Sequence, residues 1–312
     1  MADPLLFMFA GVGAAGVGLI VRSLRARLRP RPVEQVVVSS PAPDKPAPRV
    51  APVVPAAPRN EETVEDPTMP IALILVTAAA QTDPGLHRTT NEDSYLVDAE
   101  RHLVVVADGM GGHASGEVAS QLAIETIARA HATQQFDGEP DKSRPRFGDQ
   151  LVRSILTANR VVYERARNEP QHKGMGTTVV AARFSPNKQR VYIAHAGDSR
   201  CYRMREGKLR QITKDHTLGS LGVQGPTAGK LVRAIGTERK VDIDLFTDAP
   251  EAGDLYLLCS DGLSRMISNS KIEAIVASER DLDKMIAKLV AAANEAGGRD
   301  NITVIVVRVD EA

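Results

Sequence analysis

Acidic residues recur in this sequence where predicted strands end or begin, in turns rich in Gly, Ser or Asn. They are Glu92 and Asp93 in NEDSYLV, Asp108 in VVVADGMGG, Asp198 in AHAGDSR, Asp261 in LYLLCSDG and Asp300 in GGRDNITVIVV. One Asp in such a turn is usually a local cap or an Asx-turn partner. If the strand ends meet, however, these carboxylates repel one another unless cations lie between them. Oxygen donors without His or Cys clusters favour Mg²⁺ or Mn²⁺ over Zn²⁺.

Such a group of carboxylates would suit phosphate-ester chemistry. Two divalent ions about 3.5–4 Å apart can bridge one water, lower its pKa and supply a hydroxide for in-line attack on phosphorus. Gly109, directly after Asp108, has no side chain to keep its carbonyl from a metal ion. Arg88, four residues before Glu92, offers a planar fork for two phosphate oxygens. The alternative is that the acidic turns are ordinary caps and Arg88 is an ordinary surface residue.

The elements that must position these residues are mostly strands. Apolar alternation and β-branched content predict strands over residues 71–80, 94–98, 102–107, 176–184, 189–196, 199–205, 208–213, 241–246, 254–259 and 302–309. Helices are predicted over residues 116–134, 148–168, 271–278 and 281–296. Ser270 and Glu273 have the spacing of a capping box for the third helix. Short turns between strands indicate antiparallel pairing. An α+β fold follows, with sheets packed on each other and helices outside, rather than βαβ units.

The N-terminal residues have the composition of a membrane segment and a linker. Residues 5–21 are an uncharged run of 17 residues, about 26 Å as a helix, and arginines follow it directly. Positive charge after the run predicts a single anchor with the body of the protein in the cytoplasm. A surface helix and a cleaved signal peptide are the alternatives. The GVGAAG match to GxGxxG within the run lacks the βαβ context of a dinucleotide site.

The chain therefore divides into three parts. Residues 1–29 hold the predicted transmembrane segment and its basic flank, and residues 71–312 hold the folded domain. Between them, residues 30–70 contain 11 of the 19 prolines, which predicts an extended linker of up to about 120 Å. Lys and Arg number 39, as do Asp and Glu, so the bulk charge predicts no nucleic-acid partner. The two cysteines have no metal-ligand spacing and are expected to be reduced.

From about residue 71 to 309 the sequence resembles the metal-dependent PPM, or type 2C, serine/threonine protein phosphatases. The segments that carry the resemblance, in order, are GLHRTTNEDSYLV, VVVADGMGGHASGEVAS, GMGTTVVAA, YIAHAGDSRCYR, LVRAIG, LLCSDGL and GGRDNITVIVV. The resemblance implies a central sandwich of two antiparallel β-sheets flanked by α-helices, a four-layer αββα arrangement. The metal site would lie at one end of that sandwich.

The resemblance also implies a role for each site residue. Asp108 would bridge two Mn²⁺ or Mg²⁺ ions, with the Gly109 carbonyl as a further ligand. Asp261 and Asp300 would complete the protein ligands of one ion, while Glu92 and Asp93 would bind the other ion largely through water. Asp198, together with Asp261, would hold the third and weaker ion found in many bacterial members. Arg88 would bind the substrate phosphate.

One departure from the pattern concerns the proton donor. Met110 stands where some relatives have a histidine proposed as general acid, and a thioether has no proton to give. A water on a metal ion or His113 could take that role. Residues 214–236 resemble the family's flap beside the site, and His216 within it could contact substrate.

The expected function is hydrolysis of phosphoserine and phosphothreonine in proteins, opposing serine/threonine kinases. The expected partners are phosphorylated proteins, including such kinases and their substrates, and the membrane through the N-terminal helix. Two readings from other classes remain open at this point. One is a metal-binding pseudophosphatase that acts as a scaffold, and the other is a structural membrane protein whose acidic turns are only caps.

Overall fold

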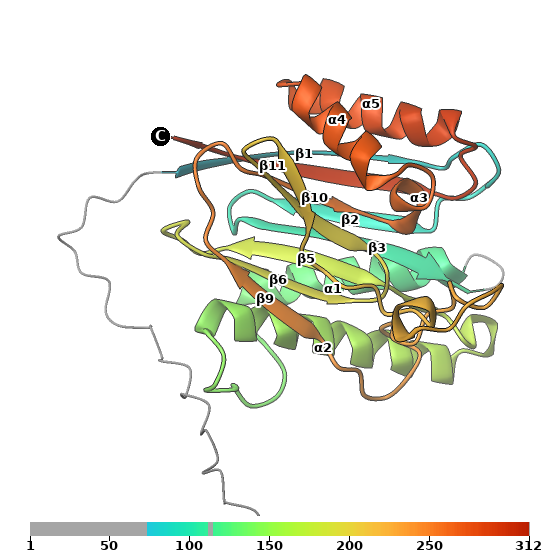
Figure 1. Cartoon of the computed structure of the whole chain (residues 1–312). Coiled ribbons are helices and arrows are strands. Elements are labelled where there is room, and N and C mark those ends of the chain that lie inside the picture. The colour runs from blue at the N-terminus through green and yellow to red at the C-terminus, as the bar shows by residue number, and fades with distance from the viewer. Residues whose placement is uncertain (1–73, 112–114, 312) are drawn as a thin grey trace, which may run out of the picture. The chain divides into compact units, whose positions relative to one another are not determined.

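The structure is a computed structural model that describes residues 74–111 and 115–311. Two antiparallel sheets lie face to face, and helices cover both outer faces (Figure 1). The first, called here the β11 sheet, has the spatial order β1 (Ile74–Asp83), β11 (Ile302–Glu311), β10 (Leu255–Cys259), β7 (Arg200–Arg205) and β8 (Lys208–Gln211). The second, the β3 sheet, has the order β2 (Asp93–Asp98), β3 (Leu103–Met110), β5 (Val179–Phe184), β6 (Val191–Ala196) and β9 (Asp244–Asp248), with β4 (Gly176–Thr177) paired to the end of β3.

The helices form the outer layers. They are α1 (Ser115–Thr133), α2 (Arg146–Asn168), α3 (Asp261–Ser264), α4 (Asn269–Ser278) and α5 (Leu282–Glu295), with 3₁₀ turns at Pro170–His172 and Gly219–Leu221. In Figure 1, α1 and α2 lie under the β3 sheet, and α4 and α5 lie over the β11 sheet. The four-layer αββα prediction is confirmed.

Strand β3 shows why its sequence is a continuous apolar run. Leu103, Val105 and Ala107 pack against α1 and α2, whereas Val104 and Val106 face the other sheet. Because successive side chains of a strand point to opposite faces, a strand buried on both faces needs apolar residues at every position. The first polar side chain after this run is Asp108, so the end of the core and the start of the site coincide.

Strand β11 has the same construction in the other sheet. Val304 and Val306 pack under α5 beside Leu289, while Ile305 and Val307 face the β3 sheet. A central layer of apolar side chains therefore joins the two sheets, and each sheet has a second core on its helix side. Burial on both faces makes the sheets rigid supports for the loops at their ends.

Element boundaries agree with the sequence predictions to within a few residues, with two exceptions. The four-residue helix Asp261–Ser264 was not predicted, because DGLS is too short to show helical periodicity. The capping box was wrong: α4 is capped by Ser268, whose hydroxyl accepts a hydrogen bond from the Lys271 N–H at 3.3 Å. Glu273 instead accepts a hydrogen bond from the Leu209 N–H at 2.8 Å and ties α4 to β8.

The predicted membrane segment, residues 5–21, and the predicted linker lie outside the described residues. Within residues 74–111 and 115–311, no helix is long and apolar enough to cross a bilayer. The division at residue 71 stays a prediction.

Candidate metal centre

The six predicted acidic residues come together where the strands of both sheets end. They are called here the carboxylate cluster: Glu92, Asp93, Asp108, Asp198, Asp261 and Asp300. Asp93 and Asp108 belong to the β3 sheet. Asp261 follows β10 of the other sheet after Ser260, and Asp300 precedes β11 with Asn301 between them. Asp198 lies in the turn between β6 and β7, where the chain passes from one sheet to the other. The cluster is therefore built from both sheets.

Pairing of β2 with β3 fixes the first part of the cluster. Asp93 and Asp108 are direct partners in the antiparallel register. The Glu92 carbonyl accepts hydrogen bonds from the Gly109 N–H at 3.1 Å and from the Ser120 hydroxyl at 2.6 Å. The backbone before β2 is thus held against the end of β3 and the first turns of α1.

Asp93 connects the two sheets. It is buried, and its Oδ2 accepts hydrogen bonds from the hydroxyls of Ser260 and Thr303, each at 2.7 Å. Ser260 directly precedes Asp261, and Thr303 lies near the start of β11. The other oxygen, Oδ1, is buried and has no hydrogen-bond partner among the described residues. A buried carboxylate oxygen without a donor is an unsatisfied group that a cation, directly or through water, would satisfy.

Asn301 holds the loop that carries Arg88. Its side-chain NH₂ donates to the carbonyls of Pro84 and Thr90, at 3.0 and 2.9 Å, and its Oδ1 accepts from the Glu92 N–H at 2.8 Å. The Arg88 Nη2 donates to Asp300 Oδ2 at 2.9 Å, and the Arg88 side chain is about half exposed. Arg88 therefore lies at the solvent side of the cluster.

The pKa shifts show that the carboxylates act on one another. Burial raises the pKa of Asp108 well above its usual value, and the charges of Asp93, Asp261, Asp198 and Asp300 raise it further. Burial likewise raises the pKa of Asp93 to about 6 and that of Asp261 to about 7. Without a cation these carboxyls hold protons that ordinary aspartates release. The convergence that the metal hypothesis requires is therefore present.

Arg265 is a member of the site that the sequence patterns did not reveal. Its guanidinium contacts Asp198 Oδ2 at 2.6 Å and Asp261 Oδ2 at 2.9 Å. Ser260, Thr303 and Asn301 were also missed, because their bonds join residues far apart in the chain. Of these residues, only Arg265 could have been found from local sequence, because a residue four positions after Asp261 lies beside Asp261 on a helical turn.

Gly109 is required by a close approach of backbone. A Cβ at this position would lie 2.0 Å from the Gly116 carbonyl oxygen and 2.6 Å from that of Glu92. Any other residue would push the end of β3 away from α1 and from the strand that carries Asp93. The small residue thus brings these chain segments together.

Of the other predicted residues, Met110 lies at the end of β3, and His113 lies outside the described residues. A cavity of about 520 Å³ lies beside Met110 and is lined mainly by flap and post-flap residues, among them Lys230, Val232, Thr237 and Lys240. The cavity is open to solvent, and Met110 relates it to the cluster, because Met110 follows Asp108 and Gly109 in β3.

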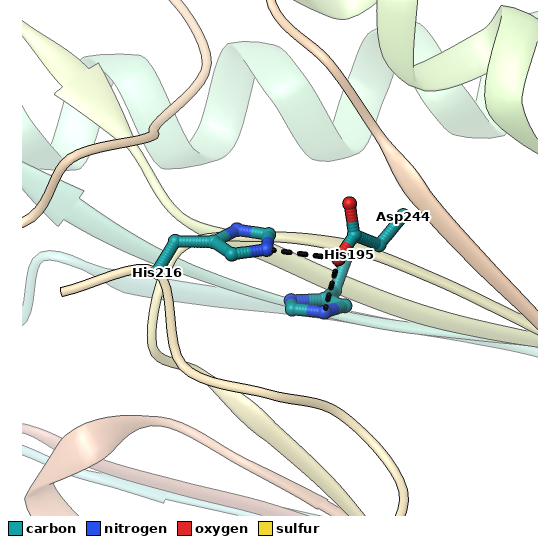
Figure 2. A group of neighbouring side chains, drawn as sticks. All are labelled: His195, His216 and Asp244. Carbon is teal, nitrogen blue, oxygen red and sulfur yellow. Dashed lines mark hydrogen bonds and ion pairs between the residues drawn. The ribbon is translucent and has the colours of Figure 1, made fainter. Parts of the chain in front are cut away.

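His216 does not match the prediction that it contacts substrate. It is buried, its Nε2 lies 3.1 Å from Asp244 Oδ2, and its Nδ1 accepts a hydrogen bond from the Gly197 N–H at 3.1 Å. Since the backbone N–H can only donate, Nδ1 carries the lone pair and the ring proton is on Nε2, facing the carboxylate. His195 stacks on this ring, with centroids 4.4 Å apart (Figure 2).

The three residues of Figure 2, His195, His216 and Asp244, are called here the imidazole cluster, and they are ligand types for a metal. Their candidate ligand atoms lie within 4.8 Å of one another. The two rings, however, are nearly parallel, with 12° between their planes, and a metal must lie in the plane of each ring it binds. The Arg233 Nη1 also lies 3.0 Å from His216 Nε2. His216 therefore supports the turn before Asp198 through its bond to Gly197, and the stacked rings lack the orientation of two ligands of one ion.

Comparison with known proteins agrees with this geometry. The sequence profile of the protein phosphatase 2C family matches residues 87–305. The chain belongs to this family. The serine/threonine phosphatase stp of Listeria welshimeri is 37% identical over 246 residues, which cover 74% of this chain and 94% of that protein. The serine/threonine protein phosphatase PstP of Mycobacterium tuberculosis is 39% identical over 246 residues, 74% of this chain and 44% of that protein.

Solved structures of phosphatase 2C family members have the same fold. The catalytic domain of PstP, crystallised with two manganese ions, is 37% identical to this chain with a TM-score of 0.66, covering 76% of this chain and 99% of that one. The serine/threonine phosphatase of S. agalactiae is 31% identical with a TM-score of 0.67, covering 76% of this chain and all of that one.

The carboxylate cluster has the donor chemistry of a site for divalent cations such as Mn²⁺. Its donors are carboxylates and backbone carbonyls, the ligands of hard divalent cations. Asp93 Oδ1, which has no hydrogen-bond partner among the described residues, and the raised pKa values of Asp93, Asp108 and Asp261 fit a site for cations.

Proposed function

We propose that this chain hydrolyses phosphoserine and phosphothreonine in proteins at a centre of two Mn²⁺ or Mg²⁺ ions. The observation that carries the proposal is the convergence of carboxylates from both sheets in a member of the protein phosphatase 2C family. When bound, two such ions lower the pKa of a water and neutralise charge on the phosphate.

The residues that would hold the ions are Asp108, the Gly109 carbonyl, Asp261 and Asp300, with Glu92 and Asp93 on the side of β2. Asp108 would be the shared ligand, because carboxylates from both sheets act on its pKa. Ser260 and Thr303 orient Asp93 through its Oδ2 and leave Oδ1 toward the centre. Hydrogen-bonded ligands of this kind keep their orientation without the ion, so less entropy is lost on binding.

Arg88 receives the phosphate at the solvent side. Its guanidinium is paired with Asp300 and is half exposed, so its N–H groups on the solvent side can donate to an oxygen of an incoming phosphate. Residues that flank the phosphoserine then lie in the cavity beside Met110. Two lysines there, Lys230 and Lys240, and the half-exposed Val232 suit a peptide with acidic and apolar positions near its phosphate.

The test is metal-dependent hydrolysis by the full chain. After chelation and dialysis, the protein should hydrolyse p-nitrophenyl phosphate and a phosphothreonine peptide only when Mn²⁺ or Mg²⁺ is added. A protein that binds Mn²⁺ without turnover would support the scaffold reading. A protein that neither binds Mn²⁺ nor hydrolyses these substrates would indicate that the acidic residues are ordinary caps of their turns.

We further propose that residues 5–21 anchor the enzyme in a membrane as a single span, with the phosphatase domain in the cytoplasm. The apolar run and the arginines that follow it support this orientation. The proline-rich linker, residues 30–70, would let the domain reach substrates within about 120 Å of the anchor, such as membrane-bound kinases and their targets.

Cell fractionation tests the anchor. A C-terminally tagged full chain should sediment with membranes and resist alkaline extraction, whereas a variant without residues 5–21 should remain in the supernatant. Equal distribution of the two proteins would refute the anchor without affecting the phosphatase proposal.

A further inference from the structure

Arg265 bridges two members of the carboxylate cluster. It directly follows the short helix α3, and its N–H donates to the Asp261 carbonyl at 2.8 Å, which closes one helical turn. That turn places the guanidinium beside Asp261 Oδ2, at 2.9 Å, and the second terminal nitrogen reaches Asp198 Oδ2 at 2.6 Å. One side chain thus joins two carboxylates of the cluster.

The two carboxylates that Arg265 joins need a positive charge between them. Asp198 is 4% exposed and Asp261 is 8% exposed, so water screens their charges poorly. A guanidinium stays protonated at any pH at which the protein is folded, and its planar fork can donate to two oxygens at once. Among the described residues, Arg265 is the cation in contact with both of these carboxylates.

A divalent ion shared by Asp198 and Asp261 would have to occupy the place of this guanidinium. Such an ion would compete with the guanidinium for the same two oxygens, Asp198 Oδ2 and Asp261 Oδ2. The Arg265 side chain is about half exposed and its Nη2 lies 3.5 Å from the Gly229 carbonyl, so it also reaches the flap. Arg265 is therefore held between the flap and the two carboxylates.

We propose that Arg265 takes the place of a third metal ion between Asp198 and Asp261, so that the centre of this chain holds two ions. The inference rests on the proposed function, because it concerns the same cluster. Arg265 contacts Asp261 only at Oδ2 among the bonds described, so Asp261 can serve one of the two ions while its other side is bound by the guanidinium. Arg265 then acts as a positioning residue for Asp261 and as a fixed charge for Asp198.

Isothermal titration calorimetry of the metal-stripped full chain with Mn²⁺ measures the number of ions that each chain binds. The wild type should bind about two ions per chain. Arg265→Gln and Arg265→Met, which remove the charge, should bind one more and weaker ion. Arg265→Lys keeps the charge and should stay at the wild-type number. Arg203→Gln is the matched control, since Arg203 pairs with Asp248 at 2.8 Å and contacts no member of the cluster.

The possible outcomes separate this inference from the proposed function. A wild type that binds three ions, or neutral variants that bind the same number as the wild type, would overturn the role of Arg265 while leaving the metal centre in place. A wild type that binds no Mn²⁺ would overturn the centre itself and the role of Arg265 with it. Two neutral substitutions of different polarity are used because one of them can fail to fold, which circular dichroism of the metal-free protein detects.

Discussion

The carboxylate cluster and the imidazole cluster differ in how their ionisable groups are balanced. In the imidazole cluster, the His216 ring has a donor on one nitrogen and a carboxylate on the other, and Arg233 pairs with that carboxylate. In the carboxylate cluster, acidic residues outnumber the two arginines, and a buried oxygen of Asp93 has no donor among the described residues. The His216 ring thus has protein partners on both nitrogens, although the stacked His195 ring has none among the described residues, whereas the carboxylate cluster holds more negative charge than its two arginines neutralise.

The two clusters therefore respond to pH with opposite sign. Burial lowers the pKa of His195 from 6.5 to about 4, so the unfolded chain binds the proton first and stability is lost as pH falls through this range. Burial raises the pKa of Asp261 from 3.8 to about 7, so the folded chain holds the proton longer and metal-free stability is lost as pH rises through this range. Ionisable residues at one end of a fold can thus have a structural or a functional role, depending on whether protein groups or bound cations balance their charge.

The largest expected effect comes from removing a carboxylate of the metal centre. Asp108→Asn or Asp261→Asn should lower kcat by more than about 100-fold, because loss of a ligand should exceed the 10–100-fold effect typical of residues that only orient one. The Tm of the metal-free protein should be unchanged or slightly higher, because the substitution removes one of the carboxylate charges that repel one another. Steady-state kinetics with p-nitrophenyl phosphate measures kcat, and activity within tenfold of wild type would contradict the assignment.

Removal of the ions should change stability in a pH-dependent way. Mn²⁺ at 100 times its Kd should stabilise the fold by about 2.7 kcal/mol, or about 5–10 °C in Tm. At one fixed Mn²⁺ concentration the gain should be larger at about pH 8 than at about pH 5, because protons compete for carboxyls whose pKa values reach about 6 and about 7 and so raise Kd at low pH. Scanning calorimetry with and without a chelator tests this. An equal gain at both pH values would mean that the cluster does not bind the ion.

Hydroxyls that orient Asp93 should affect metal binding more than fold stability. Ser260→Ala or Thr303→Val removes one of the two donors to Asp93 Oδ2 and should weaken Mn²⁺ binding by about 10–100-fold. The control is Ser154→Ala, a buried hydroxyl that hydrogen-bonds His131 far from the cluster. If titration calorimetry gives the same Mn²⁺ affinity for the Ser260 and Ser154 variants, the connection between the sheets through Asp93 is not part of the centre.

Arg88→Ala should mainly raise KM for a phosphopeptide, by about tenfold, since one charged hydrogen bond is lost at the mouth of the site. Arg101→Ala is the control, because Arg101 pairs with Asp98 at 2.9 Å on the surface away from the cluster. An unchanged KM would exclude Arg88 from phosphate binding, and a large fall in kcat alone would place it instead among the groups that act in the transition state.

The smallest expected effect concerns the imidazole cluster. His195→Phe replaces a buried ring, whose nitrogens have no hydrogen-bond partner among the described residues, by an apolar ring of similar size. Between about pH 7 and pH 5 the variant should lose about 2 kcal/mol less stability than the wild type. Urea unfolding at both pH values measures the difference. Parallel pH profiles for the two proteins would show that His195 does not titrate as its burial requires.

Much of this architecture follows from local sequence, and its functional detail does not. Runs such as LVVVA determine strand and burial together, so the strands and the residues at their ends could be predicted. Thr303, Asn301 and Arg265 acquire their roles only after the chain brings distant segments together, as in the bond from Thr303 to Asp93 across 210 positions. The capping prediction failed for a related reason, since the β8 backbone takes the Glu273 carboxylate that a local pattern assigns to the helix.

The origin of the carboxylate cluster in two different sheets has a consequence for motion. An ion held by Asp108 of one sheet and Asp261 of the other is a cross-link between the two halves of the sandwich at that end. Opening of the two sheets would then require release of the ion, so amide hydrogens at the ends of β3 and β10 should exchange with deuterium more slowly in Mn²⁺ than in a chelator, while those at the far end exchange equally.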